Sequence, residues 1–341
     1  MNSYCMFDSH DPIFDINGFW WLEENQGDYQ RLPIRMYPHL RAELIELSEH
    51  TSGGFIRFRT DSGTLYVEGL LPSCKDMNHM ARVGVSGFDV YCDGRYIDSV
   101  SGPGEQLLLQ KEIPLKGSGM REILIYFPLY NGVKALKIGI KEHATLEKTK
   151  PMTYEKPVVF YGSSITQGGC ASRPGSCYTN LLSRWLDTKI INLGFSGNAK
   201  GDPEIAERIA EIPMSVFVMD YDYNSDTEEL SRNHYPFYRI IREKHPTLPI
   251  IMISKANREV NVPVNRGDEI VYTTYHRAKA AGDENVYFLS GENFYGEYGK
   301  DTCTVDNCHP NDLGFYCMAK AIRPLLSELL EIGRASCRER V

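Results

Sequence analysis

The sequence predicts an α/β domain with a five-stranded parallel sheet, preceded by an all-β sandwich of jelly-roll type. Three observations support this fold class. Apolar residues alternate with period two in residues 1–145, whereas short apolar runs alternate with helical patterns in residues 157–330. Between them, the polar segment 146–156 contains a proline and has no apolar period, as expected of a linker. We therefore expect two domains joined by this segment.

Composition is compatible with two domains and excludes several classes of partner. The chain has 341 residues, of which 42% are hydrophobic and 11% aromatic, so it can bury a sizeable core. Its net charge of -8, without a basic run, predicts that neither nucleic acid nor an anionic membrane is a partner. The N-terminus has no signal-peptide pattern and no window is long enough to span a membrane, which together predict a cytoplasmic protein.

Cysteine usage predicts neither disulfides nor a metal centre. The nine cysteines form no CxxC pair and lack the histidine spacing of a zinc site. We expect reduced thiols that serve in packing, with no metal ion and no organic cofactor. The alternative is a metal or redox site, since four thiols flank the segments discussed below: Cys170, Cys177, Cys303 and Cys308.

The expected strands of the first domain have period-two alternation, and they are 54–61, 63–71, 87–100, 105–115 and 121–140. Turn signals at Asp93-Gly94 and Asn131-Gly132 predict antiparallel hairpins. Because no long helical pattern interrupts these strands, we expect a β-sandwich. Trp20 and Trp21 could stack on a sugar or belong to a core.

The expected strands of the second domain are short apolar runs, suited to burial on both faces, at 157–162, 188–194, 214–221, 248–255 and 284–291. Helical patterns separate or follow them at 178–186, 203–211, 237–244, 268–282 and 317–330. Strands that alternate with helices predict a parallel, doubly wound sheet whose site lies at the carboxyl ends of the strands.

The last residues, 331–341, break the preceding amphipathic pattern. They read "EIGRASCRERV", are basic, and are similar to the translation of a common sequencing adapter. We expect this tail to be non-native and leave it out of the fold prediction.

Polar residues gather in four segments at the predicted strand ends and before the last helix: Gly162-Ser163-Ser164-Ile165-Thr166, 192–198, 220–224 and Asp306-Asn307-Cys308-His309-Pro310. Acyl transfer to a hydroxyl needs a base that takes its proton, a carboxylate that orients the base, and donors for the developing oxyanion. The four segments contain residues suited to each of these roles.

Each candidate also has a plain structural alternative. Ser164 could cap the helix that follows it, Asn224 could form an Asx turn, and Asp306 with His309 could begin the last helix. Asp220 and Asp222 could instead bind magnesium, but no phosphate-binding loop accompanies them. The combination of all four segments favours the catalytic interpretation over these alternatives.

The four segments resemble, in order, the GDSIT, second-glycine, GxND and DxxHP blocks of SGNH (GDSL-like) hydrolases, and the resemblance covers 157 to about 330. It implies a flavodoxin-like catalytic domain with Ser164 as nucleophile, His309 as base and Asp306 as its orienting carboxylate. It also implies that the backbone of Ser164, together with Gly197 and Asn224, forms the oxyanion hole. The first domain is similar to that of bacterial carbohydrate esterases.

Two residues depart from the family pattern. Ser163 stands where the first block usually has Asp, and Asp222 stands where the third usually has Gly. The hydrogen bonds of the turn before Ser164 and the backbone near Asn224 are therefore expected to differ from the family's, although no reacting group is lost.

The resemblance implies a serine esterase or acylhydrolase that removes small acyl groups, acetyl above all, from an O-acylated carbohydrate. A lipase is less well supported, because no apolar lid or membrane-binding helix is apparent in the sequence. The alternative from another class is a non-catalytic carbohydrate-binding protein with a degenerate hydrolase domain.

Overall fold

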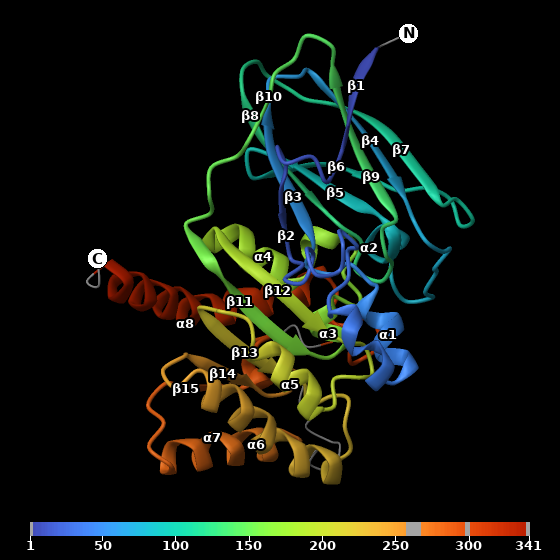
Figure 1. Cartoon of the computed structure of the whole chain (residues 1–341). Helices are drawn as coiled ribbons and strands as arrows, with labels where there is room; N and C mark the ends of the chain where they lie inside the picture. The colour runs from blue at the N-terminus through green and yellow to red at the C-terminus, as the bar shows by residue number, and fades with distance from the viewer. Residues whose placement is uncertain (1–2, 257–266, 297–300, 339–341) are drawn as a thin grey trace. The chain divides into compact units, whose positions relative to one another are not determined.

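The computed structural model describes residues 3–256, 267–296 and 301–338, and its chain divides into two compact units (Figure 1). The first unit comprises Met1–Pro151 together with Gly169–Ser176, and the second comprises Met152–Gly168 and Cys177–Val341. A short segment that follows the Ser164 turn in sequence thus groups with the N-terminal unit.

The first unit contains two antiparallel sheets, which confirms the predicted sandwich. One sheet has the order β1 (Tyr4–Asp8), β9 (Ala135–Lys141), β4 (Thr64–Leu70) and β7 (Leu108–Pro114). The other has the order β10 (Leu146–Glu147), β3 (Phe55–Thr60), β8 (Arg121–Tyr126), β5 (Phe88–Cys92) and β6 (Arg95–Val100), and β2 (Asp15–Asn17) also pairs with β3.

The alternating pattern of these strands places one set of apolar side chains in a common core. Leu65 and Val67 of β4 and Ile56 and Phe58 of β3 are fully buried in it. Because side chains alternate between the faces of a strand, Phe55 and Arg57 lie on the opposite face of β3.

The two predicted hairpin turns had different outcomes. Asp93 (φ 47°) and Gly94 (φ 75°) join β5 to β6 with two left-handed residues, as a type I′ turn requires. The Asn131-Gly132 prediction was wrong, because β8 and β9, on either side of it, belong to different sheets. The side chain of Asn131 is buried there and donates to Ser73 O (2.8 Å) and Ser86 Oγ (3.0 Å), so it supports a crossing loop.

Short helices that the sequence did not predict lie between the early strands: η1 (Ile34–His39), α1 (Ala42–Ser48) and α2 (Arg82–Ser86). The buried Arg31 donates to the carbonyls of Leu47 (2.6 Å) and His50 (2.8 Å) at the end of α1. Trp21 is buried, in keeping with a core role, whereas Trp20 is 41% exposed.

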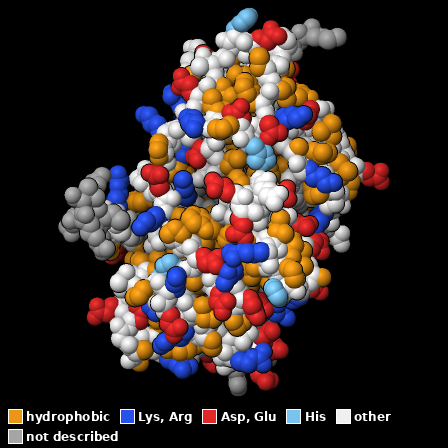
Figure 2. Space-filling model, viewed as in Figure 1, with side chains coloured by type: hydrophobic (Ala, Val, Ile, Leu, Met, Phe, Trp, Pro, Cys, Tyr) orange, Lys and Arg blue, Asp and Glu red, His pale blue; other side chains and the backbone are white. Residues whose placement is uncertain are grey.

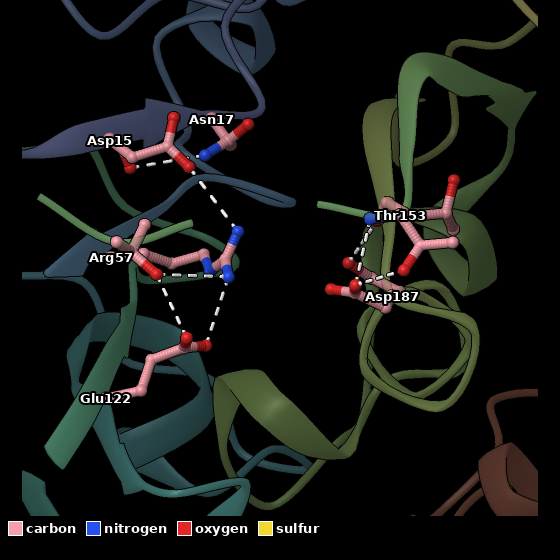
Figure 3. A network of polar contacts seen from close by, with 9 residues as sticks. Asp15, Asn17, Arg57, Glu122, Thr153 and Asp187 are labelled. Atoms are coloured by element: carbon pink, nitrogen blue, oxygen red, sulfur yellow. Dashed lines mark hydrogen bonds and ion pairs between the residues drawn. The ribbon is translucent and has the colours of Figure 1, made fainter. Parts of the chain in front are cut away.

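The segment between β10 and β11 is anchored near both ends by side chains (Figure 3). In the first unit, Arg57 pairs with Asp15 (3.5 Å) and Glu122 (3.0 Å), and Thr149 donates to Glu122 (2.9 Å). In the second unit, the backbone and hydroxyl of Thr153 donate to the Asp187 carboxylate at 2.8 and 2.7 Å.

The second unit contains the predicted parallel sheet, in the order β12 (Thr188–Gly194), β11 (Tyr154–Gly162), β13 (Val216–Asp220), β14 (Ile250–Ile253) and β15 (Val286–Leu289). The helices of this unit are α3 (Ser164–Gln167), α4 (Tyr178–Leu186), α5 (Pro203–Ile209), α6 (Thr227–Lys244), α7 (Gly267–Ala280), η3 (Gly291–Asn293) and α8 (Asp312–Arg338). The order is that of a flavodoxin-like fold and confirms the predicted class.

Helices cover both faces of this sheet (Figure 1). Phe160 of β11 meets Tyr178 of α4, which stacks on Phe315 of α8. The next residue, Tyr161, points to the other face and stacks on Phe237 of α6. Burial on both faces explains why the strands of this unit are continuous apolar runs.

The surface agrees with the mixed charge of the sequence. On the face seen in Figure 2, basic and acidic side chains are interspersed and form no large patch of one sign. None of the described helices is both long and apolar enough to cross a membrane.

Candidate active site

The strand register brings three of the four sequence segments to one edge of the sheet. Gly162, the last residue of β11, pairs with Gly194 of β12 and with Asp220 of β13. Since these strands are parallel, the loops that carry Ser164, Gly197 and Asn224 all begin at this edge.

The turn before Ser164 requires glycine at 162. A Cβ there would lie 2.0 Å from Thr166 Oγ1 and 2.5 Å from the carbonyl oxygen of Asp220. Ser163, at the position that departs from the family pattern, is the N-cap of α3, and its Oγ accepts from the Ile165 N–H at 3.2 Å. Ser163 therefore has the capping role that the alternative interpretation gave to Ser164, which is the first residue of the helix.

Ser164, His309 and Asp306 form one chain of hydrogen bonds, although His309 lies 145 residues from Ser164. Ser164 Oγ is 2.9 Å from His309 Nε2, and His309 Nδ1 is 2.7 Å from Asp306 Oδ2. A carboxylate at Nδ1 favours the tautomer that carries its proton there, which leaves Nε2 able to accept the serine proton.

The short turn from Asp306 to His309 explains how residues so close in sequence can face each other. Asp306 Oδ1 accepts from the backbone N–H groups of His309 (2.7 Å) and Cys308 (3.1 Å) while Oδ2 meets the ring. Burial acts to raise the pKa of Asp306, but these hydrogen bonds outweigh it and lower the pKa below its usual value. The carboxylate is therefore ionised at neutral pH.

Asp306 is not the cap of the last helix. Asn311 Oδ1 accepts from the N–H groups of Leu313 (3.0 Å) and Gly314 (3.1 Å) at the beginning of α8. Asn311, and not Asp306, is therefore the residue that caps α8.

The two other predicted oxyanion donors lie on the loops after β12 and β13. Gly197 has φ +68°, a left-handed conformation that favours glycine. Asn224 Nδ2 donates to the carbonyl oxygen of Phe195 at 3.0 Å, so this amide bridges the two loops. Its side chain makes no Asx turn with the described residues, and Nδ2 has a second hydrogen to donate.

A buried network beneath α3 was not singled out from the sequence. Thr166 Oγ1 and Tyr178 Oη each donate to Asp220 Oδ2 at 3.0 Å. Burial raises the pKa of Asp220 to about 6. Thr166 lies on the helix that Ser164 begins, so Asp220 supports that helix. The only sequence signal was a carboxylate at the end of a fully apolar strand.

Asp222, the second departure from the family pattern, connects neighbouring strands. Its Oδ2 accepts from the Lys255 N–H after β14 at 2.9 Å. Burial raises its pKa to about 7, and the nearby Asp220 adds to the effect. The two carboxylates are thus bound to different protein groups.

Asn192 and Gln167 tie the second loop to α3. Asn192 Nδ2 donates to Thr166 O at 2.7 Å, and Gln167 Oε1 accepts from the Ser196 N–H at 3.0 Å. Both side chains are fully buried. These bonds hold the loop that carries Gly197 against the helix that carries Ser164.

Ser, His and Asp side chains joined by hydrogen bonds recur in serine hydrolases of unrelated folds, and here they lie at the carboxyl edge of a parallel sheet. Residues 155–327 match the model of the GDSL-like lipase/acylhydrolase family, and the chain belongs to this family. Residues 5–146 match a second model, GxDLY, which describes the N-terminus of SGNH hydrolase-type esterases. No curated protein sequence matches the chain.

Solved structures share the whole two-part architecture. A protein of Bacteroides ovatus assigned to the GDSL-like lipases is 29% identical, with a TM-score of 0.86 over 96% of this chain and 98% of that one. The salicylyl-acyltransferase SsfX3 of a tetracycline biosynthetic pathway is 22% identical, with a TM-score of 0.79 over 96% and 97%. A family two carbohydrate esterase of Cellvibrio japonicus is 13% identical, with a TM-score of 0.62 over 97% and 99%. The similarity to the last two structures shows a shared fold only.

Proposed function

We propose that the protein is a serine esterase in which Ser164 is the nucleophile, His309 the base and Asp306 the carboxylate that orients it. The observation that carries this proposal is the continuous hydrogen-bonded chain from Ser164 Oγ through both ring nitrogens of His309 to Asp306. The same observation argues against a non-catalytic binding protein, because a degenerate site has no need to keep this geometry.

In the proposed reaction, His309 Nε2 takes the proton of Ser164 as Oγ attacks the ester carbonyl. The carbonyl oxygen gains the negative charge, and the N–H groups of Ser164 and Gly197 with the Asn224 amide stabilise it. The tetrahedral intermediate collapses to an acyl-enzyme as His309 gives its proton to the departing alcohol. Water, deprotonated by His309, then releases the acid and restores Ser164.

For the substrate we propose a small O-acyl ester of a carbohydrate, with acetate as the acyl group. The support is the architecture that the chain shares with the Cellvibrio japonicus carbohydrate esterase and with an acetyl xylan esterase of Butyrivibrio proteoclasticus, which is 15% identical with a TM-score of 0.61. We assign the catalytic role to residues 157–330 and regard residues 1–145 as a separate β-sandwich domain.

The test compares hydrolysis of p-nitrophenyl acetate and acetylated xylose by the wild type and by Ser164→Ala. We expect Ser164→Ala to lose turnover with an unchanged circular dichroism spectrum, because the change removes one hydroxyl and leaves the carbon skeleton of the side chain in place. In the wild type, mass spectrometry of the quenched reaction should show an added acetyl group at Ser164.

Ser163→Ala is the matched control. It should keep turnover and lose only its capping bond, which is worth about 1 kcal/mol or roughly 2–4 °C in Tm. A folded Ser164→Ala protein with wild-type turnover would exclude Ser164 as nucleophile. Activity on p-nitrophenyl acetate but none on any acetylated sugar would instead exclude only the substrate.

A further inference from the structure

The segment Gly169–Ser176, here called the strap, is part of the first unit although the residues on both sides of it belong to the second. The strap begins five residues after Ser164. The intervening Gly168 (φ 110°) closes α3, and its N–H lies 3.0 Å from the carbonyl oxygens of Ser164 and Ile165. The strap therefore follows the helix that carries Ser164 directly in the chain.

Glycines allow the strap to pack closely on the first unit. A Cβ at Gly169 would lie 2.5 Å from the Tyr130 hydroxyl, and one at Gly175 would lie 2.1 Å from the Tyr91 hydroxyl. On the other side of the contact, a Cβ at Gly84 of α2 would lie 2.2 Å from the carbonyl oxygen of Ala171. Contacts this short leave no room for a larger residue.

A buried carboxylate binds the strap at its centre. Asp89 of β5 is fully buried, and its Oδ2 accepts from an Arg173 guanidinium nitrogen at 3.0 Å and from the Gly175 N–H at 2.8 Å. Its Oδ1 accepts from Ser99 Oγ at 2.7 Å. Burial raises the pKa of Asp89 above its usual value, although these donors and the Arg173 charge act to lower it.

Arg173 is held by aromatic side chains as well as by the carboxylate. The Tyr91 hydroxyl lies 2.5 Å from the same guanidinium nitrogen, and the guanidinium carbon lies 4.0 Å from the ring centre of Tyr96. A charge-assisted hydrogen bond combined with stacking fixes the direction of a guanidinium better than either contact alone.

We propose that Asp89 and Arg173 are positioning residues: they hold the strap, and the strap, which follows α3 directly in the chain, limits the movement of the turn that carries Ser164. The inference rests on the proposed role of Ser164. The hydrogen bonds that hold the strap thus contribute to the rate of the chemical step. A displacement of a nucleophile by about 1 Å can cost about a hundredfold in rate.

The experiment uses Arg173→Met, which keeps most of the side-chain volume but removes the charge. Arg173→Lys is the conservative variant at the same position. Asp89→Asn changes the carboxylate that binds Arg173. Arg59→Met is the matched control, because Arg59 pairs with Glu147 at 3.1 Å elsewhere in the same unit. Three measurements are made on each protein: kcat and KM on p-nitrophenyl acetate, the rate of Ser164 phosphorylation by diethyl p-nitrophenyl phosphate with release of p-nitrophenolate, and Tm.

We expect Arg173→Met and Asp89→Asn to lower kcat and the phosphorylation rate together, by roughly tenfold or more, while KM stays within about threefold. Arg173→Lys should recover part of the loss, and Arg59→Met should match the wild type. A purely structural role would lower Tm and the folded fraction without a change in the rate per folded molecule, which would overturn the inference.

The same data separate failure of this inference from failure of the proposed function. If Ser164→Ala abolishes turnover but Arg173→Met and Asp89→Asn keep wild-type rates, the positioning role is wrong and the nucleophile stands. If the wild type has no Ser164-dependent turnover or phosphorylation, the proposed function itself is wrong, and the positioning inference is overturned with it.

Discussion

At the scale of single residues, His309 and Asp306 should contribute unequally although they are hydrogen-bonded partners. His309→Ala removes the proposed base and should lower kcat by about a thousandfold or more. Asp306→Asn should be milder because the imidazole remains, although an amide at Nδ1 favours the wrong tautomer. The comparison is made on kcat/KM with p-nitrophenyl acetate.

His10→Ala is the control for this comparison, since His10 Nδ1 also pairs with a carboxylate, Asp8, at 2.9 Å. It should leave kcat/KM unchanged. If Asp306→Asn proves more damaging than His309→Ala, His309 is not the base.

Asp220 should make stability depend on pH. Because burial raises its pKa to about 6 in the folded protein, the folded state binds a proton more tightly than the unfolded state. The stability that this proton contributes is complete below about pH 4 and is lost as pH rises toward 6. Asp220→Asn cannot ionise, so its Tm relative to wild type should rise by roughly 5 °C between pH 4 and 6.5.

The replacement oxygen in Asp220→Asn can still accept from Thr166 and Tyr178. Thermal unfolding across this pH range tests the prediction, with Asp226→Asn at the exposed cap of α6 as control. A pH-independent difference between Asp220→Asn and the wild type would show that Asp220 is not protonated in the folded state.

At the scale of elements, the loops after β12 and β13 are expected to act in the transition state. Asn224→Ala should lower kcat by about a hundredfold and leave KM nearly unchanged, since a donor aimed at the oxyanion acts mainly there. Asn233→Ala is a matched control, because the Asn233 amide also bridges to a loop carbonyl, Lys200 O, at 3.0 Å. A loss that lies entirely in KM would show that Asn224 binds the ground state.

Element types could be predicted more reliably than element ends. The apolar period of 178–186 matches α4 over its full length, because that helix packs one apolar stripe against the sheet. By contrast, the pattern at 237–244 marks only the end of α6, which begins at Thr227. The residues before this pattern, 227–236, are mostly polar and end in Pro236. The helix begins where Asp226 Oδ1 accepts from the Glu229 N–H at 2.8 Å.

At the scale of the whole molecule, the C-terminal tail should be dispensable. Residues 331–335 continue α8 but are exposed, whereas Leu329 and Leu330 are buried. Removal of 331–341 should therefore change Tm by less than about 2 °C and leave kcat unaltered. Removal of 329–341 is the control and should lower Tm by roughly 5 °C or more, since two buried leucines are lost. A large loss from the shorter deletion would contradict the expectation that the tail is non-native.

The sequence by itself determined the class of each half, the five parallel strands and the polar residues at their ends, because periodicity and turn chemistry act over a few residues. Only the tertiary structure decided that the loop containing Asn131 connects two different sheets, that Ser163 caps the helix begun by Ser164, and that the strap belongs to the first unit. It also decided that His309 meets Ser164 across 145 residues. Such contacts depend on how elements that are distant in sequence pack together. A pattern over a few neighbouring residues does not indicate which distant residue a side chain will contact.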